Sequence, residues 1–417
     1  MVDFKDIFSE IQRVYLADSI PWIVGFSGGK DSTTVLQMLF YALSTLPKKK
    51  LSKEIHVLCN DTLVENPAIA KYVDEQLEKI KRAGKGELFK HKPELFQVVK
   101  VRPKLEDTFW VNLIGKGYPS PNRWFRWCTE RMKINPTSNY ILNTVNKNGH
   151  AIIVLGTRKA ESANRAASMN NYKNGNNLRK HTLPNAFVYA PIAELSNNEV
   201  WAFLIQAPNP WGSINRNLLA IYGSACAGGE CPFVVETGTQ SCGKSRFGCW
   251  VCTVVDRDRS MENFIENGDV WMQGLLNFRN WLYEIRQQTN QYVPKRLGSN
   301  GVKFGSFLLK TRWEILNKLL NMQKSLSREL ITSDELRYIQ ELLVKESEGK
   351  VEEGLKRFTF ELPNGKRVAA ISDFNILLTP RKRLGPLHLK QAKLVGSRNV
   401  SSNYSLSSRV LYYEVCR

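Results

Sequence analysis

Cysteines with metal-ligand spacing are the first chemical signal in this sequence. Five of its eight cysteines fall within 27 consecutive residues, and Cys249 and Cys252 among them form a CxxC pair. Cys242 lies seven residues before that pair, and Cys128 lies far upstream in the segment RWC. Thiolates at these spacings bind a metal or an iron-sulfur cluster, or take part in sulfur chemistry. In a reducing compartment these roles explain the group better than structural disulfides do.

The spacing leaves the metal and the ligand set open. The predicted ligands are Cys128, Cys242, Cys249 and Cys252, with Cys226 and Cys231 as substitutes. Zinc also accepts four thiolates, although structural zinc sites usually have two close pairs and only one is present here. A CxxC pair without metal would be redox active. A cysteine left over would be made reactive by nearby Lys244 and Arg246 and would be able to carry a persulfide sulfur.

The segment Ser27-Gly28-Gly29-Lys30-Asp31-Ser32 is the second chemical signal. It lies between an apolar run and a helical pattern. Glycines there let backbone N–H groups turn toward a phosphate, and a helix N-terminus adds positive potential. The segment does not match G-x-x-x-x-G-K-S/T, so it is not the P-loop of ordinary ATPases and GTPases. An ordinary strand-to-helix turn is the alternative interpretation.

Polar side chains also follow two other predicted strands. Arg158 and Arg165 are seven residues apart with Glu161 between them, and guanidinium groups suit phosphate or sulfate oxygens. Ion pairs with neighbouring acids are the alternative. Asp61 and Glu65 offer oxygen ligands for Mg²⁺ or partners for ribose hydroxyls, and their alternative role is negative charge at a helix N-terminus.

Alternating strands and helices must position these residues. Apolar runs predict strands in four places: IPWIVGF from residue 20, EIHVLCND from 54, FQVVKV from 96 and HAIIVLG from 150. A charged helix is predicted from about Ala68 to Arg82, and Ser196 with Glu199 has the spacing of a capping box. This alternation is typical of a doubly wound parallel α/β sheet, whose ligands collect beyond the carboxyl ends of the strands. Cys59 is predicted to be a small buried hydrophobe in the second strand.

Three regions are predicted along the chain. Residues 1–205 form the α/β domain, residues 206–270 a Cys-rich insertion, and residues 271–417 a basic, mainly helical C-terminal region. The middle region is rich in Gly, Cys and Pro and has little periodicity. Such a segment is expected to be ordered by bound ligands more than by a large core.

The charge balance indicates a polyanionic partner. Lys and Arg number 59 against 39 Asp and Glu, giving a net charge of +20, which favours nucleic acid. Residues 271–417 hold 25 of these basic and 13 of the acidic side chains. No apolar stretch approaches 18 residues, and the N-terminus is a polar amphipathic helix pattern without signal-peptide features. We therefore expect a cytoplasmic protein that does not enter the membrane.

Two groups of aromatic residues are candidates for stacking on exposed bases. They are Trp124, Phe125 and Trp127 around the RWC segment, and later Trp271, Phe278 and Trp281. Helical spacing favours core packing for the later group.

Several motifs together resemble one known family. SGGKDS after the first strand is similar to the PP-loop of the ATP pyrophosphatases, which cleave ATP between the α and β phosphates. Four later segments follow in the order seen in the sulfonucleotide-reductase-like branch: Asn60-Asp61-Thr62 with Glu65, RWCTERMKINP from Arg126, GTRKAESANRA from Gly156, and PIAELSNNEVWAFL from Pro191. Within this branch, the Cys-rich stretch from Glu230 resembles the DndC family of DNA phosphorothioation proteins, which help replace a non-bridging phosphate oxygen with sulfur.

The resemblance implies a fold and an activity. The fold is the PP-loop, adenine nucleotide alpha hydrolase-like α/β fold. The activity is that of an ATP pyrophosphatase and sulfurtransferase, which adenylylates the DNA phosphate so that sulfur can be inserted. Implied partners are DNA, a cysteine desulfurase as sulfur donor, and other phosphorothioation subunits.

The resemblance also implies site residues and cofactors. The implied nucleotide-binding residues are Ser27, Gly28, Gly29, Lys30, Asp31, Ser32, Gly156, Arg158 and Arg165, and Lys30, Asp31 and Asp61 are the implied catalytic residues. ATP and Mg²⁺ are implied, as is a 4Fe-4S cluster on Cys128, Cys242, Cys249 and Cys252, in preference to zinc. One departure is Thr129, which stands where adenylyl sulfate reductases have the second cysteine of a pair.

Three rival interpretations share part of this pattern. An adenylyl or phosphoadenylyl sulfate reductase has the same early motifs, but its family carries a reducing cysteine near the C-terminus in an ECGLH-like setting, and this chain ends in YYEVCR. A tRNA thiolation enzyme would also account for the positive charge and the PP-loop. A DNA-binding subunit whose nucleotide site only regulates assembly is the third.

Overall fold

The computed structural model describes residues 4–161, 178–224, 248–296 and 302–348, and three short strands nearer the C-terminus. The chain divides into two compact units. Unit 1 consists of Met1–Pro103 and Pro121–Arg279, and unit 2 of Lys104–Ser120 and Asn280–Arg417. The three-region division expected from the sequence stays a prediction.

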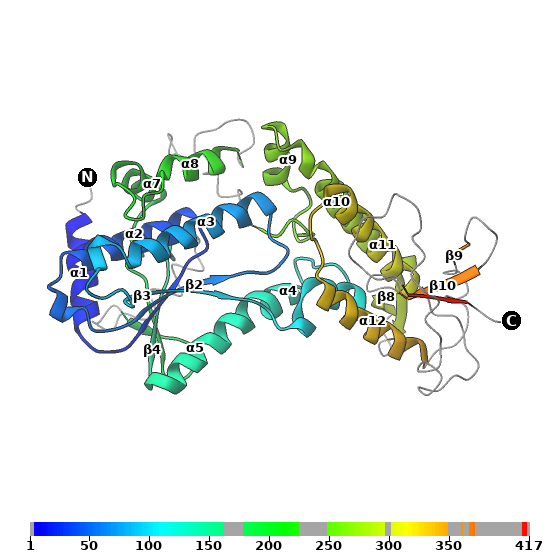
Figure 1. The fold of residues 1–417 in the computed structure, drawn as a ribbon, viewed down its shortest axis with the longest axis horizontal. Helices are drawn as coiled ribbons and strands as arrows, with labels where there is room; N and C mark the ends of the chain where they lie inside the picture. Colours follow the sequence, from blue (N-terminus) through cyan, green and yellow to red (C-terminus); the bar gives the residue numbers. More distant parts are fainter. Residues whose placement is uncertain are drawn as a thin grey trace. The chain divides into compact units, whose positions relative to one another are not determined.

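A six-stranded sheet forms the centre of unit 1 (Figure 1). Its strands are β1 (Trp22–Gly25), β2 (Ile55–Asn60), β3 (Phe96–Val101), β4 (Ala151–Val154), β5 (Leu178–Lys180) and β6 (Ala186–Tyr189). The order is β3-β2-β1-β4-β6-β5, and every neighbouring pair is parallel except β5 with β6. Trp22 is in register with Ile55 on one side and with Ile152 on the other. The predicted doubly wound α/β sheet is confirmed.

Helices cover both faces of this sheet. The helices of unit 1 are α1 (Phe4–Leu16), α2 (Lys30–Ser44), α3 (Pro67–Gly84), α4 (Trp127–Thr129), α5 (Asn135–Asn148), α7 (Asn197–Gln206), α8 (Asn215–Ser224) and α9 (Arg259–Glu266). In Figure 1, α2 and α3 lie on one face of the sheet and α5 lies on the other. The chain steps outward from β1 through β2 to β3, and then returns through α5 to β4 on the other side of β1. Beside β1 the winding reverses, and in this class of fold ligands bind at such a reversal.

The sheet is buried on both sides. On one face Ile23, Leu58 and Ile153 pack with Ile141 and Val145 of α5. On the other face the apolar side of α2 is buried, and its Phe40 ring stacks on Phe96 of β3 at 4.3 Å between centroids. Cys59 is 3% exposed, which confirms that it is a small core residue.

The helix boundaries expected from the sequence are confirmed in three places. The N-terminal amphipathic pattern is α1, and the charged stretch from Ala68 is α3, which begins one residue earlier. At the start of α7, Ser196 Oγ accepts the N–H of Glu199 at 3.3 Å, and the Glu199 carboxylate accepts the N–H of Ser196 at 2.7 Å. Both bonds satisfy donors that a helix N-terminus leaves without partners, as a capping box should.

Unit 2 combines helices with short antiparallel strands. Its helices are α11 (Leu309–Leu326) and α12 (Ser333–Glu348), with α10 (Gln273–Gln287) contributing to both units, and η3 (Leu105–Asp107) and the π-helix η4 (Val111–Gly115) come from its earlier segment. Strands β7 (Tyr292–Arg296) and β8 (Val302–Phe307) form a hairpin, and β9 (Phe360–Glu361), β10 (Arg367–Ile371) and β11 (Leu411–Glu414) form a small sheet. The helical prediction for this region therefore holds for residues 309–348, and two strand groups accompany the helices.

Polar contacts join the two segments of unit 2. Trp110 Nε1 donates to the carbonyl of Leu330 at 2.7 Å, and the buried guanidinium of Arg312 binds both Glu346 and the carbonyl of Gly115. Within the described ranges, no helix has both the length and the hydropathy that crossing a membrane requires.

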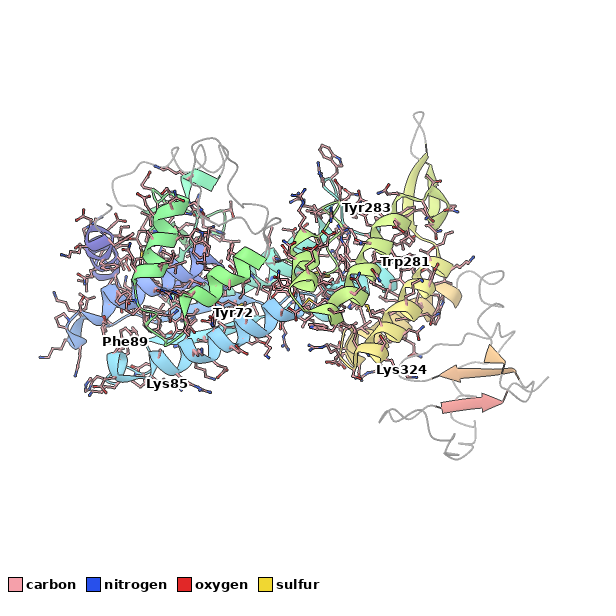
Figure 2. The ribbon with its side chains drawn as sticks, turned by 90° about the horizontal axis from the view of Figure 1, so that it is seen from above. Tyr72, Lys85, Phe89, Trp281, Tyr283 and Lys324 are labelled. Atoms are coloured by element: carbon pink, nitrogen blue, oxygen red, sulfur yellow. The ribbon has the colours of Figure 1, made fainter. Side chains whose placement is uncertain are left out.

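The core packing that helical spacing predicted for the later aromatic group is confirmed for Phe278, whereas Trp271 and Trp281 are half-buried. Phe278 is buried and lies 5.8 Å from the ring of Trp250. Trp281 of α10, labelled in Figure 2, is half-buried, and Lys318 Nζ lies 4.8 Å from its ring centre.

Candidate functional site

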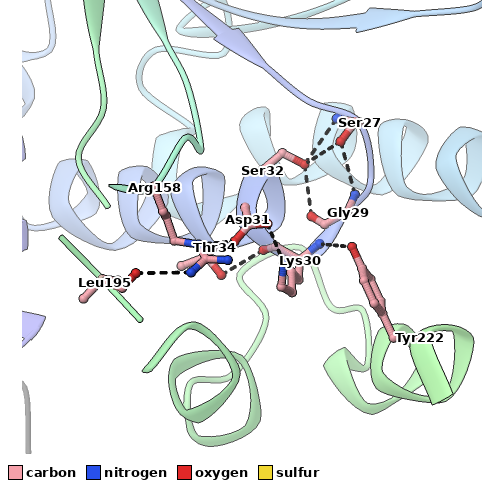
Figure 3. Close-up of polar contacts among 9 residues, drawn as sticks. All are labelled: Ser27, Gly29, Lys30, Asp31, Ser32, Thr34, Arg158, Leu195 and Tyr222. Atoms are coloured by element: carbon pink, nitrogen blue, oxygen red, sulfur yellow. Dashed lines mark hydrogen bonds and ion pairs between the residues drawn. The ribbon is translucent and has the colours of Figure 1, made fainter. Parts of the chain in front are cut away.

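The SGGKDS segment lies directly after β1 and leads into α2 (Figure 3). Gly28 has a φ of +73°, and a Cβ at this position would lie 2.6 Å from Cγ2 of Val73. Glycine is therefore required both by the backbone conformation and by the close approach of α3. The fold itself shapes this turn.

Two serine hydroxyls hold the turn closed. Ser32 Oγ accepts the N–H of Ser27 at 3.2 Å and donates to the carbonyl of Gly29 at 3.0 Å. The two hydroxyl oxygens, Ser27 Oγ and Ser32 Oγ, lie 3.2 Å apart. The N-cap residue of α2 is Gly29, which has no side chain to accept the first N–H groups of the helix. An anion is a natural partner for those groups.

Asp31 lies between two cations at the start of α2 (Figure 3). Its Oδ2 is 2.7 Å from Nζ of Lys30, and its Oδ1 is 2.7 Å from Nε of Arg158. Arg158 is 3% exposed and also donates from Nη1 to the carbonyl of Leu195 at 3.2 Å. Arg158 thus forms the kind of ion pair with an acid that the sequence left as its alternative role, and it fixes the Asp31 carboxylate.

Gly156, after β4, brings a second loop against the turn. A Cβ at Gly156 would lie 2.7 Å from the carbonyl carbon of Asp31 and 3.0 Å from the N of Ser32. These are backbone atoms and cannot rotate away. β1 and β4 are neighbours, so the turn and this loop meet at the carboxyl ends of the two strands where the winding reverses. The structure therefore brings together the predicted residues 27–32, Gly156 and Arg158.

Tyr222 of α8 is a neighbour of this turn, and no sequence motif points to it. Its hydroxyl accepts the backbone N–H of Lys30 at 3.2 Å, and Lys30 Nζ lies 5.7 Å from the ring centre (Figure 3). Trp201 supports the ring edge-on at 5.2 Å. Burial raises the pKa of Tyr222, so the hydroxyl stays protonated. Tyr222 occupies an N–H group that a bound anion would also use.

Asp61, at the end of β2, is engaged with basic side chains. Its Oδ2 lies 3.0 Å from Nε of Arg102 and 3.4 Å from Nζ of Lys100, and its Oδ1 accepts the N–H of Leu63 at 3.0 Å. Leu63 has a positive φ of 65°, an uncommon conformation for a residue with a branched side chain. Burial raises the pKa of nearby Glu65. The hard-oxygen ligands predicted for Mg²⁺ are thus one ion-paired carboxylate and one buried carboxyl.

The CxxC segment pairs with the loop that follows β2. Glu65 and Cys249 form an antiparallel bridge, the N–H of Trp250 donates to the carbonyl of Val64 at 3.0 Å, and Thr62 Oγ1 lies 3.5 Å from the sulfur of Cys249. This pairing carries the cysteine pair to the same edge of the sheet as Asp61.

Lys133 lies within electrostatic reach of three of the predicted ligands. The pKa of Lys133 is raised, first by the negative charge that Cys249 carries when it is ionised, and also by Glu65 and by Cys128 and Cys252 in their ionised forms, whereas burial lowers it. Burial raises the pKa of the Cys128 thiol, with a further rise from neighbouring Cys252. Cys249 keeps some exposed surface, but its sulfur is surrounded by protein, and burial raises its pKa to about 11 while Lys133 lowers it. Cys128, Cys249 and Cys252 therefore all act electrostatically on one lysine.

The described thiols do not form a complete metal site. Among the residues that the structure describes, no group of three or more His, Cys, Asp and Glu side chains has the arrangement needed to hold a metal ion. The predicted fourth ligand Cys242, its substitutes Cys226 and Cys231, and the predicted nucleotide ligand Arg165 lie outside the described residues. The ligand set stays a prediction.

Arg279 fixes the turn that follows the cysteine pair. Its side chain is fully buried, and its guanidinium donates to the carbonyls of Cys252 and Asp256 at 2.9 Å each and to that of Val255. Sequence reasoning missed Tyr222, Lys133 and Arg279. Only Lys133 had a usable signal, because it stands five residues after Cys128 in the segment RWCTERMKINP.

Comparison with known proteins identifies the family. The model of the phosphoadenosine phosphosulfate reductase domain matches residues 21–254, which is more than half of the chain. The chain belongs to this family. The match to this reductase domain spans the turn after β1, the loop after β4 and the CxxC pair.

Three individual proteins are similar to parts of the chain. An uncharacterized protein of Methanocaldococcus jannaschii is 28% identical over 204 residues, which are 49% of this chain and 35% of the relative, so the chain spans about a third of that relative. Phosphoadenylyl-sulfate reductase from Candida auris, in a phosphate complex, is 11% identical with a TM-score of 0.31, over 52% of this chain and 92% of that one. The U34-tRNA thiolase NcsA from Methanococcus maripaludis, with its 4Fe-4S cluster, is 13% identical with a TM-score of 0.27, over 72% of this chain and 85% of that one.

Proposed function

We propose that this protein is a PP-loop ATP pyrophosphatase and sulfurtransferase that acts in DNA phosphorothioation, as the DndC family does. One observation carries the proposal: a glycine-built anion turn occurs in the same compact unit as a CxxC pair that is paired with the loop after β2. Phosphorothioation needs a nucleotide site to activate an oxygen and thiol chemistry to handle sulfur. The net charge of +20 suits a polyanionic substrate.

The first proposed step activates the DNA phosphate. A non-bridging oxygen attacks the α-phosphorus of ATP, a P–O bond forms, and the bond to the β-phosphate breaks as pyrophosphate leaves. The N–H groups at the start of α2 and the Lys30 ammonium would stabilise the charge on the leaving pyrophosphate. Asp31, held by Arg158, would position that ammonium. We propose that Mg²⁺ arrives bound to the phosphates of ATP.

The second proposed step exchanges oxygen for sulfur. Sulfur at the oxidation level of sulfide attacks the DNA phosphorus, a P–S bond forms, and AMP leaves with the former DNA oxygen. No electron is transferred, because sulfide displaces an oxygen at unchanged phosphorus. We propose that a cysteine desulfurase supplies the sulfur as a persulfide. Two thiols of a thiol reductant reduce that persulfide to sulfide before the attack and are themselves oxidised to a disulfide. We propose further that other phosphorothioation subunits assist and that the reaction takes place in the cytoplasm.

Cys128, Cys249 and Cys252 would hold a 4Fe-4S cluster together with Cys242. The three described thiols fit by donor type, since thiolates are the usual ligands of such clusters. A bound cluster would supply electron transfer or exchangeable sulfide. Lys133 would offset the negative charge of the thiolates, and Arg279 would keep the carbonyl of Cys252 fixed.

The test measures pyrophosphate release and the modification together. We expect Lys30→Ala and Asp31→Ala to abolish ATP-dependent pyrophosphate release while the iron content stays unchanged. Lys48→Ala, an exposed lysine on η1 (Lys48–Lys50), is the matched control and should keep full turnover. Full turnover in the Lys30→Ala and Asp31→Ala variants would contradict the nucleotide assignment.

A gene-deletion experiment in cells identifies whether the substrate is DNA or RNA. Mass spectrometry of nuclease-digested DNA should find phosphorothioate-linked dinucleotides in cells that carry the gene and none after its deletion. If the dinucleotides are unchanged after deletion and a thiolated tRNA nucleoside is lost, the substrate of the same chemistry is RNA and not DNA.

Sulfonucleotide reduction is a second candidate function, because the reductase domain model matches residues 21–254. Purified protein with a thiol reductant would then release sulfite from phosphoadenylyl sulfate or adenylyl sulfate. We expect no sulfite, since the chain ends in YYEVCR where these reductases carry a cysteine in an ECGLH-like setting, and Thr129 stands where adenylyl sulfate reductases have the second cysteine of a pair.

A further inference from the structure

A short turn beside the cysteine site presents aromatic rings to solvent. This aromatic turn comprises residues 121–127, and it holds Trp124, which is 96% exposed, and Phe125, which is 43% exposed. Its last residue, Trp127, is buried and anchors the turn in the core. Trp124 has the largest exposed fraction among the exposed large hydrophobic residues of the described chain.

Hydrogen bonds make the aromatic turn a defined structure. Asn122 Oδ1 accepts the N–H groups of both Trp124 and Phe125 at 2.8 Å, and the N–H of Asn122 donates to the carbonyl of Phe125 at 3.2 Å. A side chain that ties its own backbone in this way fixes a tight turn. The backbone that carries the exposed indole is therefore ordered before a partner binds, which lowers the conformational entropy lost on binding.

The aromatic turn is attached to the cysteine site at both ends. At one end the buried hydroxyl of Thr253, the residue after Cys252, donates to the carbonyl of Pro121 at 2.7 Å. At the other end Trp127 is followed directly by Cys128. Whatever binds to the rings is brought beside the predicted sulfur chemistry.

Two arginines flank the rings. Arg123 and Arg126 both have exposed side chains, and the acidic neighbour that the structure gives Arg123 is Asp256 at 3.7 Å, a long and solvent-exposed pair. Such a pair is weak in water and is readily exchanged for a phosphate. Arginine next to an exposed aromatic ring is the combination that binds single-stranded nucleic acid: the ring stacks on a base, and the guanidinium contacts the backbone.

We propose that Trp124 and Phe125 stack on an unpaired base of the DNA substrate while Arg123 and Arg126 contact the adjacent phosphates. This inference rests on the proposed function. It adds that the enzyme holds its substrate strand through a base, and not only through the phosphate that reacts. Stacking tolerates any base, so the aromatic turn would secure the strand without reading its sequence.

The experiment measures binding of the full-length protein to a fluorescent single-stranded DNA oligonucleotide, with a duplex and an RNA of the same sequence as comparisons. We expect Trp124→Ala to weaken binding to the single strand about ten- to hundredfold, and Trp124→Phe to retain most of the affinity. Leu88→Ala removes an exposed large hydrophobic residue on η2 (Glu87–Phe89) and should change nothing. The affinity for ATP measured without DNA should be equal in all of these variants.

The arginines give an independent readout. The double variant Arg123→Gln, Arg126→Gln should weaken binding uniformly across sequences and lower the slope of log affinity against log salt by about two. Arg257→Gln removes one positive charge at an exposed arginine paired with Glu262; as a single-charge control it should leave the slope unchanged.

Each contrary outcome has a distinct meaning. If wild-type protein binds DNA and Trp124→Ala binds equally well, the aromatic turn is not the docking surface, whereas the proposed function survives. Unchanged DNA affinity with loss of the modification in cells would make the turn a protein contact and overturn the inference. Tenfold tighter binding to RNA than to DNA would also overturn it. If wild-type protein binds no nucleic acid at all, the proposed function itself fails.

Discussion

Unit 1 contains two candidate sites that are assembled in different ways. The anion turn is made of six consecutive residues after β1, and Gly156 and Arg158 close on it from the neighbouring strand. The cysteine site draws its residues from three distant segments, which are the loop after β2, the stretch from Cys128 to Lys133, and the CxxC pair. The first site is nearly complete in a contiguous motif, and the second exists only when the chain is folded.

The two sites also differ in their balance of charge. At the anion turn a single carboxylate, Asp31, is shared by two cations, so the local balance is positive and suits a phosphate. At the cysteine site Lys133 is within electrostatic range of Glu65 and of three thiols. Deprotonation of those thiols would build up negative charge, which a metal group neutralises. Each site therefore favours a ligand of opposite charge.

The largest expected effect separates the sites by metal content. We expect Cys128→Ser, Cys249→Ser and Cys252→Ser each to remove iron and acid-labile sulfide almost completely, because a cluster rarely survives loss of a thiolate ligand. Nucleotide binding should persist in all three. Cys59→Ala is the control, since Cys59 is buried in β2 outside the group and should leave the iron content intact. A variant that retained full iron would remove that cysteine from the ligand set.

The next effect is confined to the anion turn. In Gly156→Ala the new methyl group would collide with the backbone of Asp31, and overpacking of this kind costs about 1–3 kcal/mol. We expect the affinity for ATP to fall about tenfold or more in isothermal titration calorimetry, with unchanged iron content. Gly274→Ala adds the same methyl group in α10 where no atom lies within 4 Å, and it should leave ATP binding unchanged. Equal affinities for both variants would mean that the loop after β4 is not part of the nucleotide site.

A third prediction concerns the pH dependence of the cysteine site in protein stripped of metal. The Cys249 thiol has a pKa of about 11, so it is protonated at neutral pH and its alkylation by iodoacetamide should rise only as the pH approaches that value. Lys133 lowers this pKa, and Lys133→Met should therefore move the alkylation profile of Cys249 to higher pH. Peptide mass spectrometry follows each cysteine separately. The main charges that act on Cys59 are those of Glu65, Lys100, Asp61 and Asp74, so the profile of Cys59 should move much less than that of Cys249.

The smallest expected effect tests the hydroxyl at the anion turn. Tyr222→Phe removes the acceptor of the Lys30 N–H and keeps the ring against Trp201. A hydrogen bond of this kind contributes about 0.5–1.5 kcal/mol, so freeing that N–H should tighten pyrophosphate binding about two- to tenfold. Weaker binding in Tyr222→Phe would instead assign the hydroxyl to the bound ligand as a donor.

Much of the scaffold was predictable because its signals are local. Strands β1 to β4 are short apolar runs, α7 begins at a capping box, and residues 27–32 form a contiguous turn. The pairing of Arg158 with Asp31 was not predictable in this way, since 127 residues separate the two and the sequence offered nearer acids. The same limit applies to Tyr222 and Arg279, whose partners are backbone groups that any residue could have supplied.

The sequence by itself determined that this chain forms a doubly wound α/β sheet with a glycine turn after the first strand and a CxxC pair far downstream. Periodicity, helix caps and glycine spacing act over a few residues, so they can be recognised in the amino-acid sequence alone. Only the tertiary structure decided that Lys133 comes within electrostatic range of the thiols and that Arg158 forms an ion pair with Asp31. It also decided that Trp124 is exposed to solvent while Trp127 is buried. Burial and ion pairing depend on which distant segments meet, and parallel strands bring such segments together at one edge of a sheet.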